Sequence, residues 1–496
     1  MADNQNDNTK KSDNQTNNNE SINLDPNIQV EELPEEVSTP DIQVSPEELE
    51  VTDEPMIYVE DNKRKYIIIL VIFIVLFSAV FFLLYKLFLS NRPKTSAKKV
   101  ELTYWGLWDD KEIIQPLIDE YQKKNPNVKI NYELKSVKDA YAQKIVARTE
   151  RGVGPDIFRF HNSWIPELKE VLSYAPESVV SADEFSKQYY NSIVKDLVID
   201  KKVYGLPLMI DGLLLIYNED LLKTAGISSP PATWDAFIEA VEKTTVKDSS
   251  GNILTSGIAL GTAGNIQHFS DILLLMLYQN GGSIANLQAQ EAIDILSQYR
   301  RFAEPPNNVW SETMPDSVVA FAEGKVAMIF APSWQILIIK QINKDINVKS
   351  APVPQVPGAD PLSIGSYWIE GVSRKSENQL EAWKFLKYLS EKDQLLKLYE
   401  NQSKVRLFGT AYPLKELGAT LSDNPYLSGV VKQADYFITT YGIARTFDDG
   451  LNDNIIKYLE NAVNATAQGV SYRDAMQTAH QGVVEVLSRY NLISDQ

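Results

Sequence analysis

The most strongly apolar part of the chain is the run from Tyr66 to Tyr85, which has 20 residues and no charged side chain. A helix of that length measures about 30 Å, the thickness of the hydrocarbon layer of a membrane. The pattern predicts a transmembrane helix with its flanks over residues 63–90, in contact with the lipid bilayer through Tyr66–Leu89. A cleaved signal peptide is the alternative, but its apolar core is usually about 7–15 residues long and lies close to the N-terminus.

From Val100 onward, strand patterns alternate with helix patterns. The strand patterns are Val100–Trp105, Val128–Leu134 and Asp156–Phe160. Between them, Asp109–Lys124 has apolar side chains along one helical face, and Val137–Arg148 is a second helical pattern. Alternation at this spacing predicts an α/β domain with a largely parallel sheet. In such a sheet, ligands bind beyond the carboxyl ends of the strands.

Later segments fit the same α/β class. Tyr204–Asn218 and Lys325–Phe330 are strand-like. Thr233 follows two prolines and is the expected N-cap of a helix. The predicted helices are Thr233–Lys243, Ser270–Tyr278, Asn378–Leu389, Asp393–Tyr399, Asn452–Ala467 and Tyr472–Tyr490.

The acidic charge of the chain is concentrated at its N-terminal end. Residues 1–62 hold 17 of the 66 acidic residues and 2 of the 48 basic ones, which leaves 49 acidic and 46 basic residues elsewhere. This segment has too little apolar surface to form a core, so we predict a disordered acidic tail over 1–62. A short polar linker follows the apolar run over 91–99. The near-neutral remainder has no basic excess, which argues against nucleic acid as a partner.

The chain has no cysteine and only three histidines, His161, His268 and His480. The lack of cysteine excludes disulfides, thiolate metal sites, a cysteine nucleophile and a lipid-modified cysteine. Scattered histidines argue against a multi-histidine metal site, and no GxGxxG, GxxxxGK[ST], HExxH or GxSxG motif is present. We therefore expect no catalytic residues, no metal and no cofactor.

Six segments, in order along the chain, resemble the motifs of a known family. They are VELTYW at Val100–Trp105; GPDIF at Gly154–Phe158; VYGLP at Val203–Pro207, followed by LIYN at Leu215–Asn218; LLKTAGISSPPATW at Leu221–Trp234; FAEGKVAM at Phe321–Met328, with Trp334 shortly after; and EAWKFL at Glu381–Leu386. Together they resemble extracellular solute-binding proteins of the maltose-binding type, which serve ABC importers. The resemblance covers about Val100 to Tyr490.

The resemblance implies a two-lobed α/β fold of the periplasmic-binding-protein type, with strands that cross more than once between the lobes. Lobe one would comprise residues 100–208 and 364–418, and lobe two residues 212–363 and 419–496. Such domains work outside the cell membrane, so the resemblance also implies a single-pass protein with a cytoplasmic tail and an extracellular solute-binding domain. Charge alone leaves the orientation open, because basic residues flank both ends of the apolar run.

A binding cleft needs apolar platforms and a few placed polar groups. Aromatic faces suit the C–H faces of a pyranose, and the resemblance places several aromatic residues at the cleft. Tyr367 and Trp368 are neighbours in a strand and point to opposite sides, so only one should face a ligand. Asp211 interrupts an apolar crossing strand, where an unpaired charge would be costly. The predicted ligand-binding residues are Trp105, Trp108, Asp109, Phe160, Asn162, Trp164, Asp211, Trp334, Tyr367 and Trp368.

The resemblance thus implies a membrane-tethered extracellular protein that captures a small solute between two lobes and delivers it to the permease subunits of an ABC importer. The aromatic residues favour a sugar or oligosaccharide, although relatives of this type also bind other solutes. Two alternatives stay open. One is a two-lobed sensing or adhesion receptor without transport, and the other is an anchored enzyme that acts on glycans.

Overall fold

The computed structural model describes residues 62–90, 99–306 and 308–493. The predicted tail over 1–62 lies outside these residues except for Asn62, and the predicted linker over 91–99 lies outside them except for Lys99. The chain divides into two compact units, residues 1–93 and 94–496.

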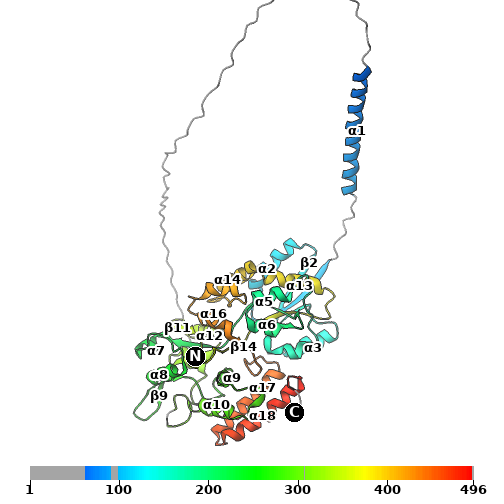
Figure 1. The fold of residues 1–496 in the computed structure, drawn as a ribbon. Helices are drawn as coiled ribbons and strands as arrows, with labels where there is room; N and C mark the ends of the chain where they lie inside the picture. Colours follow the sequence, from blue (N-terminus) through cyan, green and yellow to red (C-terminus); the bar gives the residue numbers. More distant parts are fainter. Residues whose placement is uncertain (1–61, 91–98, 307, 494–496) are drawn as a thin grey trace, which may run out of the picture. The chain divides into compact units, whose positions relative to one another are not determined.

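The described part of the first unit is one helix, α1 (Asn62–Ser90), drawn in blue in Figure 1. Its span Arg64–Leu87 has a mean hydropathy of 3.5, and none of that span is buried within the protein. By length and composition the helix can cross a membrane, and a signal sequence would have the same properties. The predicted apolar helix is therefore present.

The second unit is built on two five-stranded sheets. The first sheet has the order β2-β1-β3-β13-β6, and we call the part built on it lobe one. β1 runs parallel to β2 and to β3, whereas β13 runs antiparallel to β3 and to β6. The strands are β1 (Val100–Gly106), β2 (Val128–Leu134), β3 (Ile157–His161), β6 (Leu206–Pro207) and β13 (Trp368–Val372).

The second sheet has the order β11-β7-β10-β9-β8, and we call the part built on it lobe two. β7 runs antiparallel to both β10 and β11, and β8 runs antiparallel to β9. Only β9 and β10 are parallel among the described pairs of this sheet. The strands are β7 (Leu214–Asn218), β8 (Val246–Lys247), β9 (Ile253–Ile258), β10 (Val326–Ala331) and β11 (Val348–Ala351).

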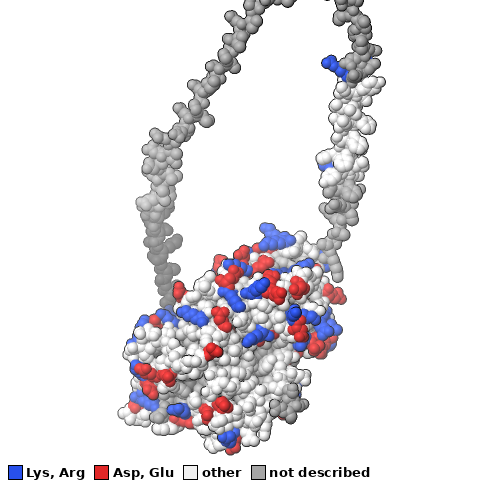
Figure 2. All heavy atoms as spheres, in the orientation of Figure 1, with Lys and Arg blue, Asp and Glu red and all other residues white. Residues whose placement is uncertain are grey.

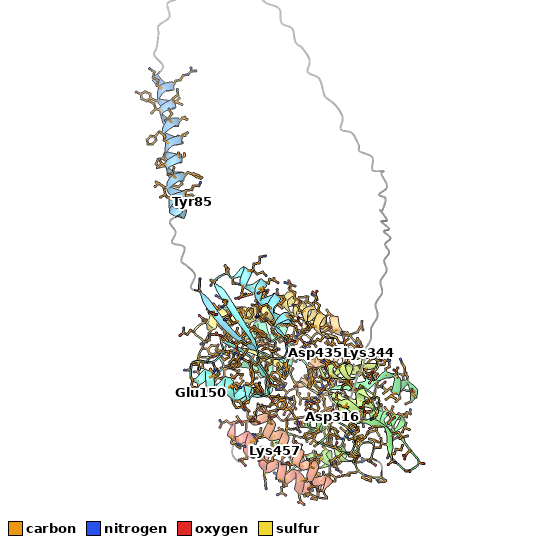
Figure 3. The ribbon with its side chains drawn as sticks, turned by 180° about the vertical axis from the view of Figure 1, so that it is seen from behind. Tyr85, Glu150, Asp316, Lys344, Asp435 and Lys457 are labelled. Atoms are coloured by element: carbon orange, nitrogen blue, oxygen red, sulfur yellow. The ribbon has the colours of Figure 1, made fainter. Side chains whose placement is uncertain are left out.

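Helices surround both sheets (Figure 1). Figure 3 shows the domain from behind, with Glu150 at the end of α3 in lobe one and Lys457 on α17 in lobe two. From the start of the second unit to α9, the helices are α2 (Lys111–Lys124), α3 (Tyr141–Glu150), the 3-10 helix η1 (Asn162–Trp164), α4 (Ile165–Leu168), α5 (Ala182–Gln188), α6 (Asn191–Leu197), α7 (Glu219–Thr224), α8 (Trp234–Thr244) and α9 (Phe269–Gln279).

The C-terminal helices α17 and α18 pack against each other, and α18 also packs against α10 of lobe two. Returning to lobe one, α14 packs against α2, so this lobe is completed by a late segment of the chain. The remaining helices are η2 (Ile284–Asn286), α10 (Gln290–Arg300), α11 (Ser317–Ala322), α12 (Gln335–Ile342), α13 (Gln379–Leu389), α14 (Lys392–Val405), α15 (Lys415–Gly418), η3 (Ala419–Leu421), α16 (Ser428–Gln433), η4 (Ala434–Tyr436), α17 (Leu451–Ala467) and α18 (Tyr472–Arg489).

Local sequence signals account for several element ends. Thr233 is the N-cap of α8, as predicted, and its side-chain oxygen accepts a hydrogen bond from the amide of Ala236 at 3.3 Å. Ser471 caps α18 in the same way through the amide of Asp474. These caps satisfy amides that have no partner within the first turn of a helix.

Two sequence predictions about the sheets need correction. The largely parallel sheet holds for β1, β2 and β3, but most of the other pairs are antiparallel. The physical reason is that β7 and β13 enter their sheets directly from the opposite lobe, without a helical crossover that would return the chain to the same end. The strand predicted over Tyr204–Asn218 is also interrupted, because residues 208–213 leave the first sheet and enter the second.

The two lobes are joined by a set of adjacent extended segments, which we call the crossing region (residues 208–213, 363–367 and 437–438). In it, β12 (Ser363–Ile364) pairs in parallel with β14 (Phe437–Ile438). The amide of Leu213 donates to the carbonyl of Ile364 at 2.9 Å, which joins the first segment to the second. The predicted two-lobed fold with more than one crossing strand is confirmed. A small two-stranded pair, β4 (Val198–Ile199) and β5 (Lys202–Val203), lies outside the two main sheets.

The crossing region leaves no room for a side chain at Gly212. A Cβ atom there would overlap the carbonyl oxygen of Ile364 and lie 2.6 Å from the ring of Phe437. We expect Gly212→Ala to lower the free energy of unfolding by roughly 1–3 kcal/mol, the usual range for overpacking. Urea unfolding measures this. Gly264→Ala is the control, because no atom lies within 4 Å of a Cβ at that position. Equal stability of the two variants would contradict the packing argument.

Candidate functional site

A cavity of about 1120 Å³ lies between the two lobes and is lined by both of them. Trp108 and Trp368 line it from lobe one, Trp334 lines it from lobe two, and Asp211 lines it from the crossing region. Trp108 follows the carboxyl end of β1, and Trp334 follows that of β10. The cavity therefore lies where a ligand is expected relative to parallel strands.

Five of the ten predicted ligand-binding residues line this cavity. They are Trp108, Asp109, Asp211, Trp334 and Trp368. Trp368 begins β13 and pairs with His161 at the end of β3, so the antiparallel strand brings its first residue to the same edge of the sheet. This edge also carries Trp108.

The other five predicted residues do not line the cavity. Trp105 lines a separate cavity of about 510 Å³ on lobe one, where Lys135 lies 4.6 Å above its ring. Phe160 and Tyr367 are fully buried. Tyr367 uses its hydroxyl to donate to Asp196 at 2.6 Å. The adjacent Tyr367 and Trp368 thus point to different places, as the strand alternation predicted.

Trp164 and Asn162 are also engaged inside the protein. The indole nitrogen of Trp164 donates to the hydroxyl oxygen of Thr446 at 2.9 Å, and its ring packs edge-on against Trp368 with the ring centroids 5.3 Å apart. The side-chain oxygen of Asn162 accepts the amide of Tyr367 at 3.2 Å. Trp164 therefore supports the wall of the cavity from behind, whereas Asn162 holds the backbone of Tyr367. The sequence pattern did not distinguish these buried positions from the surface.

Three tryptophans contribute most of the aromatic residues of the cavity wall, together with Phe447. Trp108 is 51% exposed and Trp334 is 41% exposed. The rings of Trp108 and Trp368 meet edge to face with their centroids 5.7 Å apart. Trp108 has a φ of 68°, a left-handed backbone conformation that a bulky residue rarely adopts. Such strain persists only where the surroundings hold the residue in place, and it is concentrated at functional sites.

The backbone next to Trp108 is held by a buried ion network. Arg159 donates from Nη1 to Asp109 at 2.8 Å and from Nε to Glu370 at 2.6 Å. Gln402 of α14 donates to the other oxygen of Asp109 at 2.9 Å. Burial raises the pKa of Glu370, and the neighbouring Arg159 opposes that rise. Asp109 therefore lines the cavity, but both of its carboxylate oxygens accept hydrogen bonds from other residues of the protein.

Asp211 connects the crossing region to the loop that carries Trp334. It accepts the amide of Gly212 at 2.8 Å and, from Ser333, the hydroxyl at 2.8 Å and the amide at 3.2 Å. Burial raises the pKa of Asp211 to about 6, and the hydrogen bonds from Gly212 and Ser333 oppose the rise. The hydrogen bonds at the junction of the lobes thus offset only part of the cost of a charge in this apolar segment.

Several other residues line the cavity that were not among the predicted ligand-binding residues. His161 hydrogen-bonds Ser163 and Ser366, and burial lowers its pKa to about 3, so the ring is neutral at physiological pH. His268 and Gln335 line the wall from lobe two, with the His268 and Trp334 ring centroids 5.9 Å apart. Arg406 follows α14, and Arg445 and Phe447 come from the loop before α17. Loops without periodic patterning offer no sequence signal for such residues.

The cavity has the features of a binding site. Among the residues that the structure describes, no group of three or more His, Asp or Glu side chains is placed to hold a metal ion. What the wall offers is aromatic surface, imidazole and amide groups, and basic side chains.

Comparison with known proteins agrees with this geometry. The sequence pattern of the bacterial extracellular solute-binding protein family matches residues 106–395, more than half of the chain. The chain belongs to this family. The maltodextrin-binding protein MdxE of Bacillus subtilis is 24% identical over 366 residues, which span 69% of this chain and 81% of that protein.

Solved structures of similar proteins have the same two-lobed fold. The sugar-binding protein MalE from Xanthomonas citri superimposes with a TM-score of 0.65 at 18% identity, covering 79% of this chain and 98% of that one. A cyclo/maltodextrin-binding protein complexed with maltotetraose gives a TM-score of 0.64 at 20% identity, covering 79% and 99%. These relatives are binding proteins, and at this identity the structures establish the fold.

The raised pKa of Asp211 predicts a pH dependence of stability. Its ordinary value is 3.8 and its folded value is about 6, so the folded protein binds the proton more tightly. The contribution of Asp211 to the free energy of unfolding is therefore fully present below about pH 4 and is lost as the pH rises through 6. The loss amounts to about 2–3 kcal/mol.

Asp211→Asn should remove this pH-dependent part of the free energy of unfolding, because the amide side chain does not ionise. Its carbonyl oxygen can still accept the hydrogen bond from Gly212. We expect the wild type to lose about 2–3 kcal/mol relative to the variant between pH 4 and pH 7, measured by urea unfolding at each pH. Asp196, whose pKa burial also raises to about 6, contributes equally to both proteins and cancels. The exposed Asp360→Asn is the control. A difference that does not change with pH would show that Asp211 titrates normally.

Proposed function

We propose that this protein captures a sugar or oligosaccharide between its two lobes, outside the cytoplasmic membrane, and delivers it to an ABC importer. The observation that carries the proposal is the cavity between the lobes, to which Trp108, Trp368 and Trp334 contribute from both sides. Tryptophan faces suit the C–H faces of sugar rings, and the similar proteins named above include a maltodextrin-binding protein and a structure with maltotetraose.

The crossing region is the proposed hinge. Its short extended segments are the direct connection between the two sheets, so a change of a few backbone angles there can rotate one lobe against the other. A sugar that touches tryptophans of both lobes binds the closed arrangement more tightly than the open one. Only such a difference in affinity can shift the equilibrium toward the closed form.

Sugar binding should depend on Trp334. We expect a sugar to raise the melting temperature of the chain in a screen that also includes amino acids and polyamines, with about 2.7 kcal/mol of stabilisation at 100 times its Kd. Trp334→Ala should weaken its binding roughly 10- to 100-fold, the size of one aromatic stacking contact. Isothermal titration calorimetry measures the change. Tyr174→Ala is the control, because Tyr174 is an exposed aromatic residue outside the cavity. Stabilisation by another solute class but by no sugar would refute the sugar assignment.

We also propose that α1 anchors the binding domain as a single transmembrane helix, with the acidic N-terminal segment in the cytoplasm. The uncharged apolar run Tyr66–Tyr85, within the span Arg64–Leu87, supports this anchor. We expect the full-length chain to stay in the membrane fraction after alkaline carbonate washing, and protease added to intact cells without their wall to digest the binding domain. A chain lacking residues 66–85 is the control and should be washed off. A mature protein that begins near Lys98 and is free of the membrane would contradict the anchor.

A further inference from the structure

Basic side chains outnumber acidic ones in the wall of the cavity between the lobes. Seven basic residues line it, against four acidic ones. The outer surface differs, since basic and acidic groups are intermixed over the face of the domain drawn in Figure 2. The basic residues of the wall are Lys138, Arg159, Lys340, Lys344, Lys404, Arg406 and Arg445, and the acidic ones are Asp109, Asp211, Asp271 and Asp316.

The acidic residues of the wall already accept hydrogen bonds from the protein. Asp109 and Asp211 are held as described above. Asp271 accepts the amide of Ala444 at 3.1 Å, and Asp316 accepts the amide of Val318 at 2.9 Å as the N-cap of α11. The carboxylates that a neutral sugar would use as acceptors for its hydroxyl groups are therefore partly engaged.

Most of the basic residues are engaged as well. Arg445 pairs with Glu460 at 2.8 Å, and Lys404 pairs with Glu400 at 2.8 Å. Lys340 donates to the carbonyl of Ile346 at 2.8 Å. Lys138 lies 5.2 Å above the ring of Phe447. These contacts reduce the attraction that each cation can offer a ligand.

Arg406 differs from these residues. Its Nε and Nη2 atoms are buried and have no hydrogen-bond partner among the residues that the structure describes. The nearest carboxylate oxygen is Oδ1 of Asp109, at 3.6 Å from Nη2, and that oxygen already accepts a hydrogen bond from Gln402. A guanidinium group keeps its charge and has five N–H donors, so buried donors without an acceptor cost free energy.

Arg406 is also positioned to reach a ligand. Its side chain is 23% exposed and belongs to the wall of the cavity. Because Nε and Nη2 make no hydrogen bond, turning the guanidinium toward the cavity breaks no hydrogen bond of these atoms and changes the 3.6 Å ion pair with Asp109. Asp109 directly follows Trp108, so the guanidinium lies beside the aromatic platform of lobe one.

We propose that the solute is an anionic sugar, and that Arg406 selects it by binding its carboxylate or phosphate while the tryptophans contact its rings. The planar guanidinium matches two oxygens of either group at once. Such a group accepts hydrogen bonds without donating any, which suits a wall rich in donors. This inference rests on the proposed sugar-binding function and names the class of sugar.

The test compares matched ligands on the full-length chain in detergent micelles by calorimetry. The ligands are a uronate oligosaccharide, the neutral oligosaccharide of the same length and linkage, and a sugar phosphate. We expect the uronate or the phosphate to bind at least tenfold more tightly than the neutral sugar, and the better of the two identifies the anionic group.

Variants of Arg406 separate a contact with ligand from a structural role. Arg406→Gln should remove most of the tenfold preference and change neutral-sugar affinity less than twofold, whereas Arg406→Lys should retain part of the preference. Arg374→Gln is the control, because Arg374 is an exposed arginine of lobe one outside the cavity. Melting temperatures of all variants verify folding.

Four results would overturn the inference. Equal affinity for neutral and anionic sugars would show that the cavity does not distinguish ligands by their charge. An equal loss of both ligand classes in Arg406→Gln would make Arg406 a structural residue. If neutral sugars bind and anionic ones do not, this inference fails while the proposed function stands. If neither class binds, the proposed function fails with it.

Discussion

The buried cation of Arg159 organises the wall of lobe one. Its guanidinium lies between Asp109, which follows β1, and Glu370 of β13, so three strand segments that are distant in sequence meet at one charge. Removing one member of such a network leaves an uncompensated buried charge, which typically costs about 3–5 kcal/mol. The network therefore fixes the end of β1 and the residues beside it. Trp108 directly precedes Asp109 at that fixed end, and the guanidinium of Arg406 lies 3.6 Å from the same carboxylate.

This arrangement explains how the cavity can hold unusual conformations. Trp108 adopts a left-handed backbone next to the anchored Asp109, and Phe447, which also lines the cavity, has a φ of 57°. Trp164 of lobe one donates to Thr446, one residue before Phe447. Each strained aromatic residue thus has a neighbour that is held by a buried polar contact. Rigid placement lowers the entropy that is lost when a ligand is bound.

The sequence was sufficient for the features that depend on local patterns. The strands and helices from Val100 to Phe160, the N-cap at Thr233 and the alternation of Tyr367 and Trp368 all follow from neighbouring residues. The antiparallel pairs do not, because they depend on where the chain crosses between lobes. Likewise, Phe160 and Trp164 carry the same aromatic signal as Trp108, and only their packing behind the wall shows that they are buried.

Arg406 could not be found from the sequence for a related reason. It lies in an irregular segment after α14, and its relation to the cavity arises from the packing of α14 against α2. What distinguishes it is that the one nearby carboxylate, Asp109, is already shared by Arg159 and Gln402. The four residues that compete for hydrogen bonds here come from three segments that are far apart in the sequence, so no local pattern reveals the competition.

The net charge of the whole chain is a poor guide to the charge of its ligand. The formal charge of −18 belongs mostly to residues 1–62, which precede the part of the chain that matches the family. At physiological ionic strength, charges are screened beyond about 8 Å, so a solute inside the cavity responds to the side chains of the wall. There the basic residues are in excess, and Arg406 has two buried donors, Nε and Nη2, that make no hydrogen bond with the residues that the structure describes. An acidic protein can therefore select an anion, because selection depends on the few charged groups that are close to the ligand and whose hydrogen-bond donors lack an acceptor in the fold.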